Sequence, residues 1–185
     1  MSARIRVLKF AGIALMSLLI VAQAFRIQKD NPPVTADLNA PAPVKEIMKR
    51  SCYGCHSDDT VWPWYSDIAP ASWVVSYDVH EGRAELNFSV WGNYSVAKRL
   101  KKLGKISEEI ADGDMPPWYY VYPVHMDARL SDADLQKLND WIASERDDLK
   151  RIARQGSNLH EDGRLLRFGQ LFKVRSIPSS GSLGG

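Results

Sequence analysis

The pentapeptide Cys52-Tyr53-Gly54-Cys55-His56 constrains this chain more than any other feature of its sequence. It contains both cysteines of the chain, and two cysteines three positions apart on a helix lie on one face. Each thiol of such a pair can add across a vinyl group of one haem, and the histidine that follows then sits under the iron. The pattern therefore predicts one haem c, attached covalently through Cys52 and Cys55, with His56 as the proximal iron ligand.

Three other interpretations of the cysteine pair compete with haem attachment: a thioredoxin-like redox pair, half of a zinc site and a structural disulfide. A thioredoxin-like site lacks its usual βαβ surroundings in this sequence, and a zinc site lacks a second cysteine pair. A disulfide between Cys52 and Cys55 in a haem-free structural protein stays open. Export to an oxidising compartment favours covalent haem, because a catalytic dithiol there would need a reductant.

The first 25 residues have the pattern of an export segment, with a basic start and an uncharged apolar run (Arg4, Arg6 and Lys9, then Phe10 to Ala22). The sequence Ala22-Gln23-Ala24 predicts a cleavage site after Ala24. If the segment is not cleaved, residues 10–25 would anchor the chain in the inner membrane, although this run is short for a span. The basic residues before the run place the N-terminus inside. In either case the rest of the chain is expected in the periplasm.

Composition divides the rest of the chain into three regions. Residues 26–43 carry four prolines and no periodicity, which predicts an extended linker. Residues 44–150 form the domain, and the absence of strand alternation in it predicts an all-α fold. Residues 151–185 are basic and end in a low-complexity run, which predicts a flexible tail. The tail could contact anionic lipid headgroups or simply be solvated.

Apolar spacing places several helices within the domain. The opening stretch puts both thiols on the apolar face of one helix, with members at Val44, Ile47, Met48, Ser51, Cys52 and Cys55. Further helices are expected around residues 71–79 and 96–110. The last helix is expected to start after Ser131 as N-cap, with Asp134 in an imperfect capping box, and to run to about Leu149.

Charge and aromatic content narrow the classes of ligand. The net charge of the whole chain is only +2, which argues against a basic nucleic-acid binder, so no nucleic-acid partner is expected. Six Trp and seven Tyr crowd mostly between positions 53 and 141. The middle of the chain must therefore surround a large flat group or form a dense aromatic core.

The sixth position of the iron decides what a haem here can do, because a second protein ligand favours electron transfer and an open position admits small molecules. Met115 is the preferred candidate, since Pro116 and Pro117 hold its thioether on a stiff segment. Gap-filling in an aromatic core is the competing role for this methionine. His125 is the alternative sixth ligand, and the weaker candidates are Met126, His80 and His160.

Several segments of the sequence resemble those of one known family. These are Cys52-Tyr53-Gly54-Cys55-His56-Ser57, Trp62-Pro63-Trp64-Tyr65, Pro70-Ala71-Ser72-Trp73, Glu81-Gly82-Arg83, Leu86-Asn87-Phe88-Ser89-Val90-Trp91 and Met115-Pro116-Pro117. Together with the closing helix from Leu130 to Ile142, they resemble the bacterial haem-binding domain family of small exported monohaem cytochromes, which is similar to class I cytochrome c. The resemblance implies a cytochrome c-like helical domain wrapped around one covalent haem c, often with an uncleaved N-terminal anchor.

Two further residues are candidates for contacts with the haem. Arg83 could bind a propionate through a bidentate contact, and Trp62 could line the pocket or donate to the other propionate. A surface ion pair between Arg83 and Glu81 or Glu85 explains the arginine equally well.

The function expected from these patterns is that of a periplasmic monohaem cytochrome with His/Met ligation. Such a protein carries one electron between other redox proteins of an electron-transfer chain and is not an enzyme. The alternative is a haem peroxidase, or a gas or redox sensor, with an open or displaceable sixth ligand.

Overall fold

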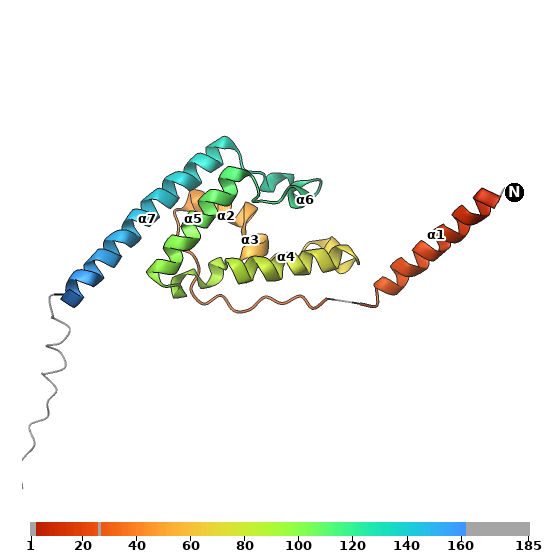
Figure 1. Cartoon of the computed structure of the whole chain (residues 1–185), viewed down its shortest axis with the longest axis horizontal. Coiled ribbons are helices and arrows are strands. Elements are labelled where there is room, and N and C mark those ends of the chain that lie inside the picture. The colour runs from red at the N-terminus through yellow and green to blue at the C-terminus, as the bar shows by residue number, and fades with distance from the viewer. Residues whose placement is uncertain (1–2, 26, 162–185) are drawn as a thin grey trace, which may run out of the picture.

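The computed structural model describes residues 3–25 and 27–161 of the chain. In these ranges every regular element is a helix and no strand occurs, which confirms the predicted all-α class. Figure 1 shows a helical domain with α1 projecting from it. The α-helices are α1 (Ala3–Ala22), α2 (Ala42–Ser51), α3 (Tyr53–His56), α4 (Ala71–Glu85), α5 (Val96–Asp112), α6 (Trp118–Val121) and α7 (Asp132–Glu161). The short 3-10 helices are η1 (Trp64–Asp67), η2 (Phe88–Asn93) and η3 (Met126–Ala128).

The core lies between α2, α5 and α7. α5 packs along α7, and α2 contacts the first half of α7 (Figure 1). Ile47 and Met48 of α2 belong to the same buried cluster as Leu138 and Trp141 of α7, as expected from their apolar spacing. The cluster also includes Phe88 and Trp91 of η2 and Leu103 of α5. The first and last helices of the domain therefore hold each other next to the pentapeptide.

The predicted single helix through both thiols is interrupted. α2 ends at Ser51, and Cys52 adopts the non-helical angles φ −125° and ψ −40° before α3 begins. The buried Tyr53 ring explains this turn, because it stacks on Phe88 with ring centroids 5.2 Å apart. Hydrogen bonds continue across the turn, since His56 N donates to Cys52 O at 3.0 Å. Both thiols thus remain on one side of the chain although the helix axis changes.

α4 is longer than expected and extends from Ala71 to Glu85 through Gly82. This glycine allows a close approach between α4 and α3. A Cβ atom at position 82 would lie 2.7 Å from the carbonyl oxygen of Cys55, closer than such atoms approach in proteins. Gly82 is therefore a packing contact within the helix and not its end.

The predicted linker is extended, but it packs on the domain and does not hang free. Leu38 is buried in the core, and its backbone N–H donates to Phe88 O at 3.0 Å. Ala36 N–H donates to Ser89 O at 3.0 Å, and Gly92 N–H donates to Ala36 O at 2.8 Å. In Figure 1 this segment runs beside α4 before it reaches α2. Residues 27–41 are thus a structural part of the domain.

The capping box expected at the start of α7 is present. Asp134 N–H donates to Ser131 Oγ at 3.2 Å, and Ser131 N–H donates back to Asp134 Oδ2 at 3.1 Å. The helix continues beyond Leu149 to Glu161, so residues 151–161 of the predicted tail are helical. The prediction of flexibility for the rest of the tail falls on residues 162–185, outside the described residues.

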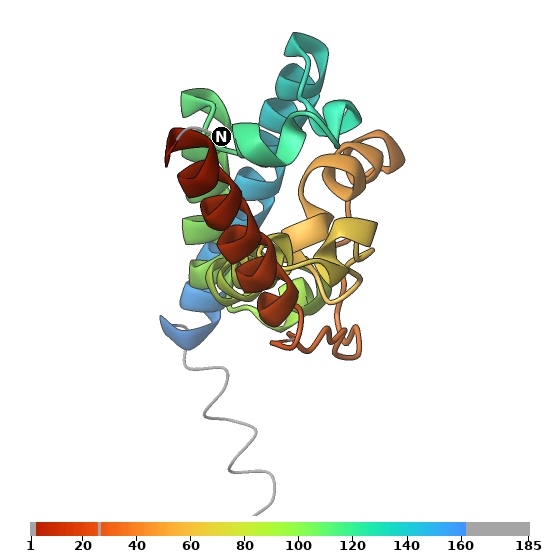
Figure 2. The same cartoon turned by 90° about the vertical axis from the view of Figure 1, so that its right-hand side faces the viewer.

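α1 begins at Ala3 and is longer than the apolar run read from the sequence. None of its residues is buried, and the helix is long and apolar enough to cross a membrane. In Figure 2 the domain lies behind α1, which crosses the view as a separate rod. The helix is compatible with either a signal sequence or an anchor.

Candidate haem site

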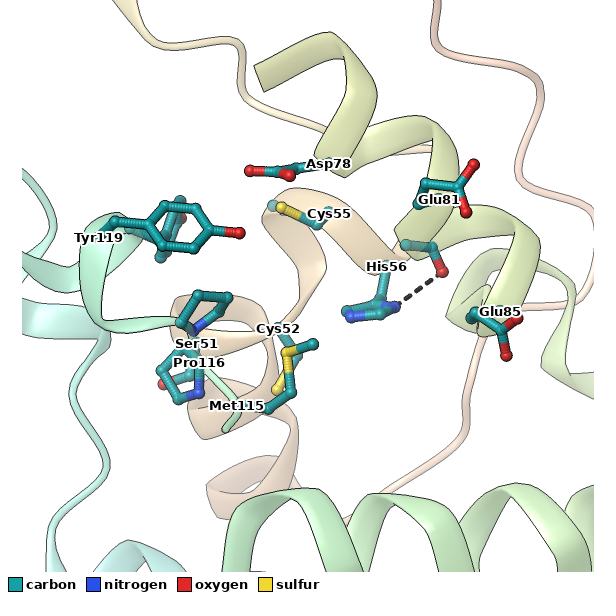
Figure 3. Close-up of a pocket in the computed structure, with 14 residues that line it drawn as sticks. Ser51, Cys52, Cys55, His56, Asp78, Glu81, Glu85, Met115, Pro116 and Tyr119 are labelled. Carbon is teal, nitrogen blue, oxygen red and sulfur yellow. Dashed lines mark hydrogen bonds between the residues drawn. The ribbon is translucent and has the colours of Figure 1, made fainter. Parts of the chain in front are cut away.

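Two adjoining cavities lie beside the pentapeptide. Their volumes are about 210 and 230 Å³, and both are lined by Cys52, His56, Glu85 and Met115. The first continues to α6, where Tyr119 and Tyr120 line it, and the second continues along α5. Figure 3 shows Cys52, Cys55, His56 and Met115 arranged around one space. Residues from α2, α3, α4, α5 and the loop after α5 therefore enclose a single site.

The two thiols are not joined by a disulfide. Burial raises the pKa of Cys52 to about 12 and that of Cys55 to about 11. At neutral pH both groups are therefore protonated thiols, unlike the low-pKa thiolates of redox-active cysteine pairs. Among residues 3–25 and 27–161, no three His, Cys, Asp or Glu side chains cluster closely enough to hold a metal ion. The geometry thus favours neither a thioredoxin-like pair nor a zinc site.

The ring of His56 is oriented by the backbone of α4. Its Nδ1 lies 2.8 Å from Gly82 O and 3.1 Å from Leu86 O, so Nδ1 carries the proton and donates to these carbonyls. Figure 3 shows this bond with the rest of the ring facing the cavity. Burial lowers the pKa of His56, which favours the neutral ring. The unprotonated Nε2 is thereby available to a metal, with a carbonyl partner behind the ring as metal-bound histidines usually have.

Gly82 is a site residue that sequence reasoning did not assign. Its lack of a side chain lets α4 approach α3, and its carbonyl is then in place to orient His56. The sequence signals were the segment Glu81-Gly82-Arg83 of the family resemblance and the glycine itself, which near a helix end is often read as a C-cap. Gly54 has a similar packing role, because a Cβ atom there would lie 2.9 Å from the hydroxyl oxygen of Tyr120.

Met115 reaches the site because of the way in which α5 ends. Gly113 follows the helix in the left-handed conformation, with φ +79°. The N–H groups of Asp114 and Met115 both donate to Glu109 O, at 3.0 and 3.2 Å. This turn places the Met115 side chain on the lining of both cavities, where it remains 38% exposed. The structure thus brings Met115 and His56 to the same site.

Ser51 contributes a buried polar group to the first cavity. The residue is 7% exposed, and its Oγ has no hydrogen-bond partner in the described part of the chain. Buried hydroxyl groups are nearly always satisfied. A polar atom of a bound group would meet this need, so Ser51 is consistent with a cavity that is filled in the working protein.

Arg83 and Trp62 lie elsewhere. Both line a polar cavity of about 470 Å³ between the linker and α4, and neither lines the cavities beside the cysteines. Arg83 Nε donates to Ser57 O at 2.7 Å, and Nη1 donates to Asp30 O at 3.0 Å. Its Nη2 donates to the side chains of Asn31 and Thr60 at 2.9 and 3.0 Å. Arg83 therefore ties the linker to the loop after the pentapeptide, and its contact with a haem stays a prediction.

The other candidate iron ligands occupy different surroundings. His125 stacks on Tyr120 with ring centroids 4.3 Å apart, and its Nε2 lies 2.7 Å from the hydroxyl of Tyr65. It lines a small cavity that Cys55 also borders, but neither of the two that His56 lines. His80 lines the polar cavity beside Arg83, and Met126 is 63% exposed. The side chain of His160 lies outside the described residues.

Comparison with known proteins identifies the family. The model of the haem-binding domain family matches residues 17–144, which is more than half of the chain. This chain belongs to the haem-binding domain family. Searches of curated proteins and of solved structures each gave no significant match. The family resemblance noted in the sequence is thus confirmed, and haem is the cofactor that the family binds.

The residues present fit a haem. The site of this haem-binding domain is apolar along most of its wall and offers a neutral imidazole, a thioether and two thiols to the same space. The imidazole and the thioether are groups that bind haem iron, and the thiols are groups that add to haem vinyl groups. Asp78, Glu81 and Glu85 border the first cavity, while the second is bordered by both acidic and basic groups, namely Glu85, Glu109, Lys102 and Lys105.

Proposed function

We propose that the protein is a periplasmic c-type cytochrome that carries one electron. In this proposal Cys52 and Cys55 hold one haem c through thioether bonds, and His56 and Met115 are the iron ligands. The observation that carries the proposal is that His56 and Met115 line the same two cavities, together with Cys52. In this space His56 and Met115 would hold the iron of a haem, and the thiols of Cys52 and Cys55 would hold its vinyl groups.

His56, Cys52 and Cys55 would hold the cofactor in a fixed position. His56 presents Nε2 while the carbonyls of Gly82 and Leu86 fix its tautomer and ring plane. Cys52 and Cys55 are free thiols beside the cavity, so both could add to vinyl groups when the cofactor is attached. Two covalent links and one imidazole from adjacent residues would keep the cofactor in place through repeated oxidation and reduction.

The distal side would exclude water and small molecules. Met115 covers the site from the loop after α5, and Pro116 and Pro117 restrict the backbone that carries it. Haem supplies an iron that gains or loses one electron when bound, and a thioether opposite an imidazole raises its potential relative to two imidazoles. No substrate is changed at the protein, so the expected partners are other redox proteins on the outer side of the inner membrane.

The test is an optical spectrum of the purified protein, oxidised and reduced, with and without carbon monoxide, for the wild type and for Met115→Ala. We expect the ferric wild type to show the weak far-red band of sulfur–iron ligation and the ferrous wild type to resist carbon monoxide. Met115→Ala should lose both properties. Met126→Ala is the matched control, because Met126 is an exposed methionine outside both cavities, and it should behave as the wild type.

A haem enzyme or sensor is the second candidate, and one observation favours it. Asp78 and Tyr119 line the first cavity, and Tyr119 donates a hydrogen bond to Asp78. Burial raises the pKa of Asp78 despite this bond, which suits a group that transfers protons to a bound small molecule. Ready binding of carbon monoxide to the ferrous wild type would overturn the His56/Met115 assignment and favour this function.

A further inference from the structure

The end of α1 is joined to the domain by specific hydrogen bonds. The side chain of Gln23 binds both backbone groups of Ala69: its Nε2 donates to Ala69 O at 3.0 Å, and Ala69 N–H donates to its Oε1 at 3.0 Å. Ala69 is buried, and buried backbone N–H and C=O groups need hydrogen-bond partners. The Gln23 side chain provides a partner for both groups of Ala69. Beside them, Trp73 Nε1 donates to Phe25 O at 3.1 Å. We call this set, Gln23, Phe25, Ala69 and Trp73, the joint.

The joint includes the residues that cleavage would remove. Gln23 lies between Ala22 and Ala24 of the possible cleavage site, so cleavage after Ala24 would leave both backbone groups of Ala69 without their present partner. The match to the haem-binding domain family begins at residue 17, inside α1, so the end of this helix belongs to the region that matches the family. Both observations favour a helix that stays attached to the domain.

Exposed aromatic and aliphatic side chains surround the joint. On α4 and just before it, Ile68 is 46% exposed, Trp73 39%, Val74 52% and Tyr77 65%. Phe25, on the segment after α1, is 65% exposed. Phe25 shares a cavity of about 140 Å³ with Gln23 and Ala69, which places the end of α1 directly against this surface. We call these five residues, Phe25, Ile68, Trp73, Val74 and Tyr77, the joint face.

The joint face lies on the side of the domain from which α1 projects. In Figure 1 the first turns of α4 point toward the foot of α1, and in Figure 2 α1 stands in front of the domain. α1 itself has no buried residue and is apolar enough to span a membrane. If α1 lies in a bilayer, the joint face is at the level where the chain leaves it, because Gln23 bonds directly to Ala69.

We propose that the joint face rests on the outer interfacial layer of the membrane that α1 enters, and that the joint fixes the domain in this orientation. The occupant of the face is the boundary between lipid headgroups and acyl chains. Trp and Tyr are enriched at this depth because their rings are apolar and their N–H or O–H groups are polar. The ion pair between Lys29 and Asp67, with N to O distance 2.6 Å, lies beside the face and would stay among the headgroups.

The proposal does not depend on the state of the iron, and its test uses the full-length protein in phosphatidylcholine nanodiscs. The tryptophans are replaced biosynthetically with fluorotryptophan, and fluorine NMR spectra are recorded with and without a lipid that carries a nitroxide near the top of its acyl chain. Trp73→Phe assigns the resonance of Trp73. Trp141 is the internal reference, because it is a residue of α7 whose side chain is buried in the core. Intact mass of the membrane-derived protein is measured on the same sample.

We expect the intact mass to include α1 and the Trp73 resonance to lose most of its intensity beside the nitroxide lipid, while that of Trp141 is retained. Gln23→Ala should restore much of the Trp73 intensity by loosening the joint. Gln136→Ala is the matched control, since Gln136 bonds only within α7, and it should leave the attenuation unchanged. Cleavage after Ala24, or equal attenuation of Trp73 and Trp141, would overturn the proposal. Equal attenuation in the wild type and Gln23→Ala would contradict the role of the joint.

Discussion

The two sides of the site are built in different ways. On one side, His56 is held by long-range contacts: α3 packs against α4, and the carbonyls of Gly82 and Leu86 fix the ring from positions far along the chain. On the other side, Met115 is placed by a local turn, since Gly113 and two N–H bonds to Glu109 O end α5 and aim the loop. Met115 is also partly exposed.

This difference predicts that substitutions on the two sides affect different properties of the protein. Changes on the His56 side disturb the packing of the domain, so they should affect folding and cofactor retention together. Changes on the Met115 side disturb one loop, so they should affect ligation at a small cost in stability. Under the proposed His56/Met115 ligation, the sixth ligand could thus change without repacking of the core. The predictions below test this division from the largest expected effect to the smallest.

The largest effect is expected from removing the thiols. In the double variant Cys52→Ala, Cys55→Ala the haem has no covalent link, so acid–acetone extraction should release it completely, whereas the wild type should keep it. Ser51→Ala is the matched control, because it changes the neighbouring side chain in the same cavity and should leave the haem bound covalently. Haem that resists extraction from the double variant would contradict thioether attachment.

The next effect concerns Gly82. Gly82→Ala puts a Cβ atom 2.7 Å from Cys55 O, and we expect the free energy of unfolding to fall by about 1–3 kcal/mol, as for other overpacked sites. The separation of α4 from α3 should also disturb the His56 ring and shift the haem spectrum. Urea unfolding of the loaded protein, followed by fluorescence, measures the first effect.

Gly104→Ala is the control for this variant. Gly104 also lies inside a helix, α5, but a Cβ atom there meets nothing closer than Arg146 Nη1 at 3.9 Å. Alanine is favoured over glycine in a helix interior, so this variant should gain up to about 1 kcal/mol. If both variants were stabilised alike, the close approach of α4 to Cys55 would be wrong.

The sequence predicted those parts of the molecule that depend on local patterns. The apolar stripes of α2 and α7 and the capping box at Ser131 follow from spacing, and the structure contains them. Helix lengths were less predictable. α4 runs through Gly82 because packing on Cys55 overrides the low helix propensity of glycine.

At the site, contacts between residues far apart in the chain could not be predicted from the sequence. The spacing of residues cannot show that the Gly82 carbonyl turns the His56 ring, because the two residues meet only in the fold. For the same reason the sequence left Arg83 open between a propionate contact and a surface ion pair. In the fold its guanidinium ties the linker to the loop after the pentapeptide, and a contact with the haem stays a prediction. An arginine has five N–H donors and therefore many possible partners, and only the fold selects among them.

A smaller effect is expected on the Met115 side from Gly113→Ala. Position 113 has φ +79°, and an L-residue in this region costs about 1–2 kcal/mol. The loop should shift or fray, so carbon monoxide should bind the ferrous variant faster than the wild type while the haem stays attached. Stopped-flow mixing with carbon monoxide measures this rate.

Gly156→Ala is the matched control, since Gly156 lies exposed in α7 with nothing near its Cβ position. It should bind carbon monoxide at the wild-type rate. A Gly113→Ala variant that lost its haem, or that resisted carbon monoxide as the wild type does, would break the proposed division between the two sides.

The smallest effect is expected at the contact between α2 and α7, where neither Arg50 nor Asp134 lines the two cavities beside the cysteines. The hydrogen bond from Ser131 Oγ at 2.7 Å, together with Arg50 of α2, lowers the pKa of Asp134 in the folded protein. A carboxyl whose pKa is depressed by folding contributes stability above its unfolded pKa, near 4, and loses it as the pH falls through the folded value. Asp134→Asn should therefore reduce the free energy of unfolding by up to about 1 kcal/mol at pH 7.

The same reduction should shrink steadily below about pH 4, where the wild-type carboxylate is protonated as well. Urea unfolding at a series of pH values measures it, with Asp140→Asn as control, because Asp140 lies farther along α7 than Asp134 and accepts a hydrogen bond from Gln136 instead of from Ser131 or Arg50. The haem spectrum of Asp134→Asn should equal that of the wild type at every pH at which the protein is folded. A destabilisation of the same size at low and neutral pH would show that Asp134 acts through its shape and not its charge. A change in the spectrum would show that the contact between α2 and α7 influences the position of His56. The packing that holds His56 would then include α7 as well as α3 and α4.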